Sequence, residues 1–99
     1  MPIKPGSPEW IAKVARMVAA ERLQPMGWFF LSFAGDEGFR GGVYIQAQGP
    51  TLAHSRSHQL GLNPGGSVEI TQVPDESLLP APQYRHRLLS RAELEALDV

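Results

Sequence analysis

The run MGWFFLSFA, residues 26–34, limits the possible folds of this 99-residue chain more than any other feature. It is too short and too aromatic for a helix, and it has the composition of a buried strand. Side chains alternate between the two faces of a strand, so both faces of this one carry large apolar groups. Phe29, Leu31 and Phe33 share one face, and Trp28 and Phe30 share the other. The sequence therefore predicts a central strand that needs cover on both sides.

Two further segments have the alternating pattern of strands. They are residues 39–48 and residues 67–73. The turn residues 35–38 predict a hairpin between the first two strands, with a loop of about four residues. Gly41-Gly42 lies inside the second strand, where glycine weakens packing. The pair therefore predicts a bulge, or a place where another backbone or a ligand comes close.

Two main helices flank these strands. Ser7-Pro8-Glu9 combines an N-cap hydroxyl, a proline at the first helical position and an acid in the first turn. It begins an amphipathic helix that ends near Leu23, just before Gln24-Pro25. A second helix of two to three turns is predicted over residues 51–60, with Gly61 as its left-handed C-terminal residue.

The chain changes character after residue 73. Three prolines within nine residues argue against regular structure. Residues 74–89 are therefore predicted to run over the surface as an extended segment, anchored by Leu78 and Leu79. Ser90-Arg91-Ala92-Glu93 then has the capping-box pattern and begins a short helix. Residues 1–6, with two prolines and a glycine, are predicted to form a flexible arm.

These elements predict one α+β domain over residues 1–99, because a chain of this length supports a single core. Their order is helix, strand, strand, helix, strand and a short C-terminal helix. A right-handed crossover gives a three-stranded sheet in the order 2-1-3, with both main helices on one face. The other face then exposes Trp28, Phe30 and Tyr44. Such a patch predicts a homo-oligomer.

The composition excludes several classes of function. The chain has no cysteine, which rules out disulfides, thiolate catalysis and cysteine-based metal sites. Nine Lys and Arg against ten Asp and Glu create no overall positive field, so nucleic acid is not an expected partner. No stretch reaches the roughly 18 apolar residues that cross a bilayer, and the first ten residues do not have the pattern of a signal peptide. We therefore expect no membrane association and a cytoplasmic location.

A candidate ligand site combines residues from three parts of the chain. His54 and His58 have the i, i+4 spacing of metal ligands, but no carboxylate lies close in sequence, so neither a metal nor a cofactor is expected. Asn63-Pro64-Gly65-Gly66 reads as a type II turn whose amides suit an anion, although turn chemistry alone explains it. The predicted ligand-binding residues are Arg40, Gly41, Gly42, His54, His58, Asn63, Gly65 and Gly66.

The residues WFFLSFAGDEGFRGGVYI and LGLNPGGSVEI resemble a group of short proteins from actinobacteria and their phages. A Trp-aromatic-x-Leu-Ser-Phe strand, a Gly-Phe-x-Gly hairpin and a Leu-Gly-x-Asn-Pro-Gly-Gly turn carry this resemblance. It covers residues 28–70. The resemblance implies a small phage-associated cytoplasmic protein. It carries over no site residue, because no activity is assigned to that group.

The leading hypothesis is a non-enzymatic binding module for a small anionic ligand at an oligomer interface. In a phage protein it corresponds to a sponge or sensor of a nucleotide-derived signal. One alternative is an adaptor or inhibitor that grips a host protein with its exposed aromatic face. Another is a small phosphoesterase that depends on His54 and His58. No Gly-x-Ser-x-Gly elbow is present, and no catalytic residue is predicted.

Overall fold

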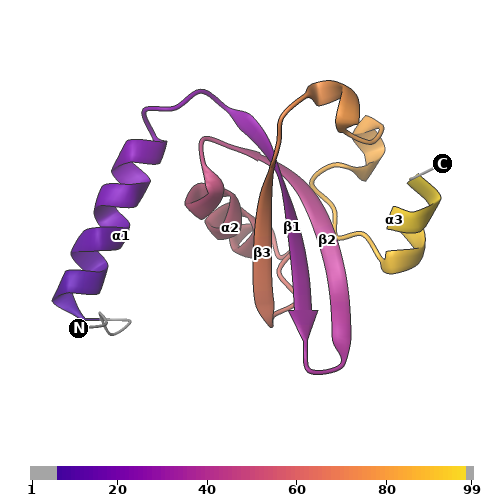
Figure 1. The fold of residues 1–99 in the computed structure, drawn as a ribbon, viewed down its shortest axis with the longest axis horizontal. Helices are drawn as coiled ribbons and strands as arrows, with labels where there is room; N and C mark the ends of the chain where they lie inside the picture. Colours follow the sequence, from indigo (N-terminus) through magenta and orange to yellow (C-terminus); the bar gives the residue numbers. More distant parts are fainter. Residues whose placement is uncertain (1–6, 98–99) are drawn as a thin grey trace.

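A computed structural model describes residues 7–97 and shows, within them, three α-helices and a three-stranded antiparallel sheet (Figure 1). The strands are β1 (Gly27–Gly35), β2 (Gly38–Ala47) and β3 (Ser67–Val73), in the order β2-β1-β3. The helices are α1 (Pro8–Glu21), α2 (Pro50–Gln59) and α3 (Arg91–Leu97). The predicted α+β class, strand order and short C-terminal helix are confirmed. The predicted arm at residues 1–6 lies outside the described residues.

The central strand β1 supplies the middle of the core. Leu31 lies opposite Val43 of β2 and Ile70 of β3, so these three side chains share a face. Both neighbours run antiparallel to β1, and β3 therefore runs parallel to β2, as predicted. The buried core residues are Phe29, Leu31, Phe33, Val43, Ile45 and Ala47, together with Ala53 of α2.

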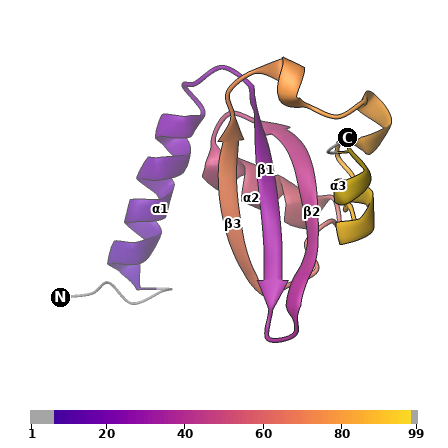
Figure 2. The same cartoon turned by 45° about the vertical axis from the view of Figure 1, so that its right-hand side comes forward.

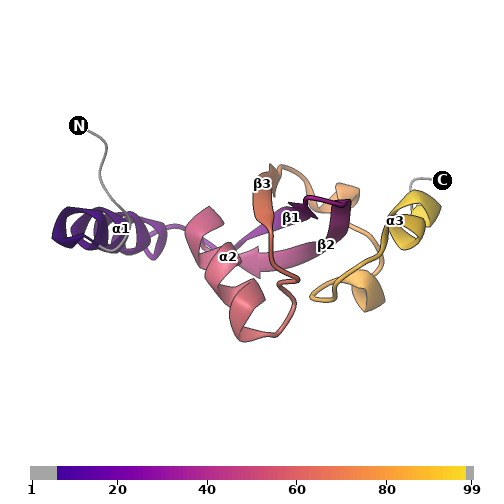
Figure 3. The ribbon, with the colours of Figure 1, turned by 90° about the horizontal axis from the view of Figure 1, so that it is seen from below.

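Helix α2 covers this apolar face of the sheet (Figure 3). Its end matches the prediction: Gly61 has a φ of 71°, and the Leu62 N–H donates to the Ser57 carbonyl at 2.8 Å. This pattern is a Schellman motif, in which glycine takes the left-handed conformation at no steric cost. The helix therefore stops where the chain must turn back toward β3.

Helix α1 begins as predicted, because the Trp10 N–H donates to Ser7 Oγ at 3.2 Å. Its position differs from the simple picture of two helices on one face. The C-terminal end of α1 contacts α2, and the rest of α1 projects beyond the β3 side of the sheet (Figures 1 and 3). None of its residues, all of which the structure describes, is buried.

The hairpin loop is shorter than the sequence predicts. Gly35 pairs with Gly38, so the loop contains only residues 36 and 37. The predicted bulge is confirmed: Phe33 pairs with Gly41, but Ala34 pairs with Phe39, which leaves Arg40 as the extra residue.

The second face of the sheet is partly covered, whereas an exposed aromatic patch was predicted. Trp28, Phe30 and Tyr44 are half-buried. After β3 the chain forms two short 3-10 helices, Glu76–Leu78 and Pro82–Tyr84, and crosses to the outer side of β2 (Figure 2). The prediction failed because this segment folds back onto the sheet within the same chain.

Residues 84–90 attach to the outer edge of β2 through backbone hydrogen bonds. The N–H groups of Gly42 and Leu89 each donate to the other's carbonyl, at 3.0 and 2.7 Å, and the His86 N–H donates to the Tyr44 carbonyl at 2.7 Å. The anchor is Leu89, which is fully buried; of the two predicted anchors, Leu78 is 62% exposed and Leu79 is half-buried. The buried leucine is the one whose backbone pairs with the sheet.

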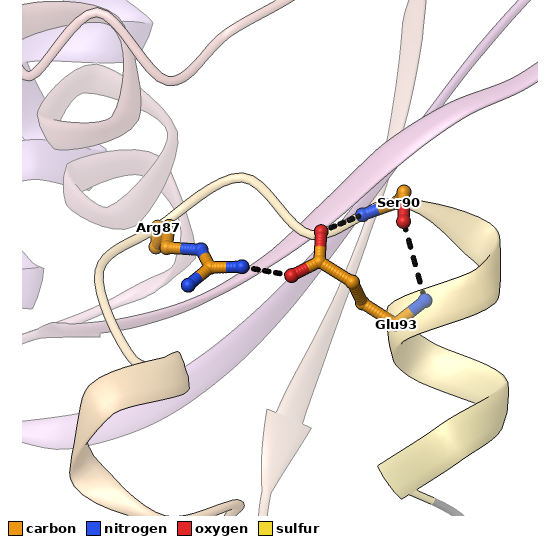
Figure 4. A network of polar contacts seen from close by, with 3 residues as sticks. All are labelled: Arg87, Ser90 and Glu93. Carbon is orange, nitrogen blue, oxygen red and sulfur yellow. Dashed lines mark hydrogen bonds and ion pairs between the residues drawn. The ribbon is translucent and has the colours of Figure 1, made fainter.

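The capping box begins α3 as predicted. The Ser90 N–H donates to the Glu93 carboxylate at 3.1 Å, and the Glu93 N–H donates to Ser90 Oγ at 3.2 Å (Figure 4). The Arg87 guanidinium pairs with the same carboxylate. Among residues 7–97, no helix has the length and apolar character needed to cross a membrane.

Candidate functional site

Four of the predicted ligand-binding residues lie together at one end of the sheet, in what we call the turn cluster: Arg40, His54, Asn63 and Gly65. The Arg40 guanidinium donates to the Pro64 carbonyl at 3.2 Å. Asn63 Oδ1 accepts the Gly65 N–H at 2.8 Å, and Asn63 Nδ2 lies 3.3 Å from His54 Nε2. The sequence therefore predicted a real spatial cluster, and its polar atoms are largely bonded to each other.

Other predicted residues have structural roles instead. A Cβ atom at Gly41 would lie 2.7 Å from the Leu88 side chain, and one at Gly42 would lie 2.6 Å from the Phe30 ring. The close approach expected at this pair is therefore made by the chain's own residues. Gly66 packs against the Ala34 carbonyl in the same way.

His58 does not join the turn cluster. It is exposed on α2, and its imidazole forms no hydrogen bond with any residue from 7 to 97. His54, one turn earlier, is half-buried and lies against Asn63. Among the described residues, no group of three or more histidine or acidic side chains is arranged to hold a metal ion.

The junction between α1 and α2 is a polar contact that the sequence analysis missed. The Glu21 carboxylate accepts the N–H groups of Thr51 and Leu52, at 3.2 and 2.9 Å. The amide of Gln48 donates to the carbonyls of Arg22 and Gln24, at 2.9 and 3.1 Å. These bonds hold the C-terminal end of α1 against the start of α2.

A polar hollow of about 350 Å³ lies beside this contact, and we call it the junction hollow. Two arginines line it, Arg22 at the end of α1 and Arg56 of α2. The Arg56 guanidinium donates to the Gln46 carbonyl at 2.6 Å. Neither arginine forms an ion pair with a carboxylate of residues 7–97. The remaining polar lining comes from Gln46, Gln48, Ser55 and Gln59.

His86 bonds to β2 through its side chain as well as through its backbone. Its Nε2 accepts the Gln46 N–H at 3.1 Å, and its ring centroid lies 5.1 Å from that of Trp28. A nitrogen that accepts must be unprotonated, so the proton of this neutral ring lies on Nδ1. Burial, together with the charges of Arg56 and Arg85, holds the pKa of His86 below its ordinary value of 6.5.

A continuous apolar surface lies on α1. Trp10, Ile11, Val14 and Val18 recur at the spacing of one helix face, and they line a shallow groove on the helix. Trp10 is 38% exposed and Ile11 is 60% exposed. An amphipathic helix normally buries this face, but residues 7–97 cover it only in part: Val14 and Val18 are half-buried, whereas Trp10 and Ile11 are exposed.

The fold and these surfaces define a small α+β domain with a projecting helix. Comparison with known proteins gives no match: no family model, no curated protein and no solved structure is similar to this chain. The resemblance to short actinobacterial and phage proteins stays a prediction.

Proposed function

We propose that the protein is a non-enzymatic protein–protein interaction module that works through the apolar face of α1. The observation that carries this proposal is the exposure of Ile11, Trp10 and their neighbours on a helix with no buried residue among the described ones. Burying apolar surface contributes about 25 cal/mol per Å². A protein surface is therefore a favourable cover for this face.

A second copy of the chain fits this role best. Each copy carries an unpaired helix face and also an edge strand, β3, whose outer side pairs with no strand of residues 7–97. Val68 and Ile70 of β3 are only half-buried. Because each copy supplies both surfaces, two copies can cover each other's exposed surfaces in a closed dimer with two-fold symmetry.

Sedimentation across about a hundred-fold range of concentration tests this proposal, because association depends on mass action. We expect the native chain to form dimers and Ile11→Glu to remain monomeric with unchanged helix content. Arg16→Glu introduces the same side chain on the opposite face of α1 and should leave the dimer intact. A native chain that sediments as a monomer throughout the range would contradict the proposal.

A second candidate function is the binding of a small anionic ligand. The observation that favours it is that Arg22, Arg40 and Arg56 each lie among polar groups without a carboxylate partner in residues 7–97. A panel of nucleotides in a thermal unfolding assay tests it, because a ligand that binds the folded state raises Tm. No rise with any member of the panel would argue against this function.

A cytoplasmic location also stays a prediction.

A further inference from the structure

We infer that the junction hollow is a binding site for a small organic phosphate held between Arg22 and Arg56. The inference rests on the second candidate function, anion binding, and it names both the site and the ligand class. The site lies at the contact between the end of α1, the end of β2 and α2, and it shares no residue with the turn cluster.

Charge is the first reason. Two arginines from different elements line one hollow, and no acidic side chain of the described residues lines it. The nearest acid in the sequence, Glu21, already accepts two backbone N–H groups of α2. Two arginines that have no ion-pair partner among the described residues suit a phosphate dianion, and guanidinium groups bind phosphate oxygens in a bidentate geometry.

Preorganisation is the second reason. Arg56 is half-buried, and its bond to the Gln46 carbonyl fixes the guanidinium in place. A guanidinium has five N–H donors, so most of them remain available to a ligand. A side chain that is already ordered loses less conformational entropy when it binds.

Size and lining indicate an organic phosphate and not a bare ion. A volume of about 350 Å³ falls in the lower part of the roughly 300–1,000 Å³ range of small-molecule sites. Leu52 and Met26 add apolar surface, and the amides of Gln48 and Gln59 add hydrogen-bonding groups. The arginines therefore suit the phosphate, and the remaining lining suits an organic group attached to it.

The turn cluster is the weaker place for an anion. It offers one guanidinium, Arg40, which already donates to the Pro64 carbonyl. The backbone N–H of Gly65, the amide expected to hold an anion there, donates instead to Asn63 Oδ1. An anion at the turn would have to break that bond, whereas one in the junction hollow would not displace an ion pair of the described chain.

Amide chemical-shift mapping by NMR tests the inference, with adenosine monophosphate as the probe and adenosine as its neutral control. We expect the phosphate to shift the amides of Gln48, Ser55 and Gln59, and adenosine to leave them unchanged. Arg22→Gln should weaken binding about tenfold or more, since a hydrogen bond to a charged group is lost. Arg22 is the cleaner target, because its side chain makes no hydrogen bond within residues 7–97. Arg40→Gln is the matched control and should bind normally.

The outcomes separate the site from the function. Shifts confined to residues 63–66 that disappear in Arg40→Gln would overturn the junction site and keep anion binding. An absence of shifts at every residue would overturn both. Equal shifts with adenosine and its monophosphate would show that charge does not drive binding, and would overturn the inference.

Discussion

The Glu21 carboxylate at the end of α1 accepts the backbone N–H of Leu52, in the first turn of α2, at 2.9 Å. It also accepts the Thr51 N–H at 3.2 Å. Helix α2 needs this external cap because its own N-cap residue, Gly49, has no side chain to offer. A Cβ atom at Gly49 would collide with the Glu21 side chain, so glycine leaves room for the capping carboxylate. One carboxylate thus caps α2 and holds α1 in position.

Removing this cap should destabilise the fold. We expect Glu21→Ala to lower the free energy of unfolding by about 1–2 kcal/mol, the usual cost of losing an N-cap at a helix dipole. Urea denaturation followed by circular dichroism measures the loss. Glu9→Ala removes an exposed acid from the first turn of α1 and should cost less than about 0.5 kcal/mol. Equal losses in the two variants would contradict the capping role.

Phe30 of β1 and Leu94 of α3 leave no room for a side chain at Gly42. A Cβ atom there would lie 2.6 Å from the Phe30 ring and 3.2 Å from Leu94. We expect Gly42→Ala to cost about 1–3 kcal/mol through overpacking. The control is Gly27→Ala in β1, whose Cβ would find its nearest neighbour at 3.8 Å. That variant should unfold at nearly the same urea concentration as the native chain.

Leu89 should be the anchor of the C-terminal segment. Truncating this fully buried side chain with Leu89→Ala leaves a cavity, and we expect a loss of about 2–5 kcal/mol. Leu78→Ala changes the same residue type in the same segment, but Leu78 is 62% exposed and its truncation should cost little. Chemical denaturation of both variants distinguishes them. Similar losses would mean that residues 84–90 do not hold the segment on the sheet.

Stability should fall in mildly acidic solution because of His86. Its folded-state pKa lies below the ordinary value of 6.5, so the unfolded chain takes up a proton first as the pH falls. The stabilisation is complete above about pH 6.5 and is lost as the pH falls from there toward the folded-state pKa. Below that window, protonated Nε2 can no longer accept the Gln46 N–H.

Urea midpoints measured from about pH 7.5 down to about pH 5.5 check this expectation, a window in which most carboxylates stay ionised. His86→Asn should be less stable at neutral pH and should lose much of the pH dependence. Asparagine tolerates the positive φ of 54° at this position. His58→Ala, at an exposed histidine, should keep the native pH profile. A native profile in His86→Asn would rule out His86 as the cause.

Features set by local chemistry could be read from the sequence. The apolar run 26–34 is the central strand β1, Ser7 and Ser90 cap their helices, and Gly61 ends α2. The parallel direction of β2 and β3 followed from the expectation of a right-handed crossover. The sequence also suggested that Arg40, His54, His58 and the Gly65-Gly66 turn converge, and the turn cluster brings Arg40, His54 and Gly65 together without His58.

The remaining features depend on contacts between residues far apart in the sequence, and only the tertiary structure decided them. Nothing local to Glu21 indicates that it caps a helix that begins at residue 50. Nothing local to His86 shows that it covers Trp28 and bonds to the edge of β2. The sequence by itself determined which segments are helices and strands, because caps and periodicity act over a few residues. The fold decided which surfaces are filled and which stay open, because burial depends on what the rest of the chain brings there.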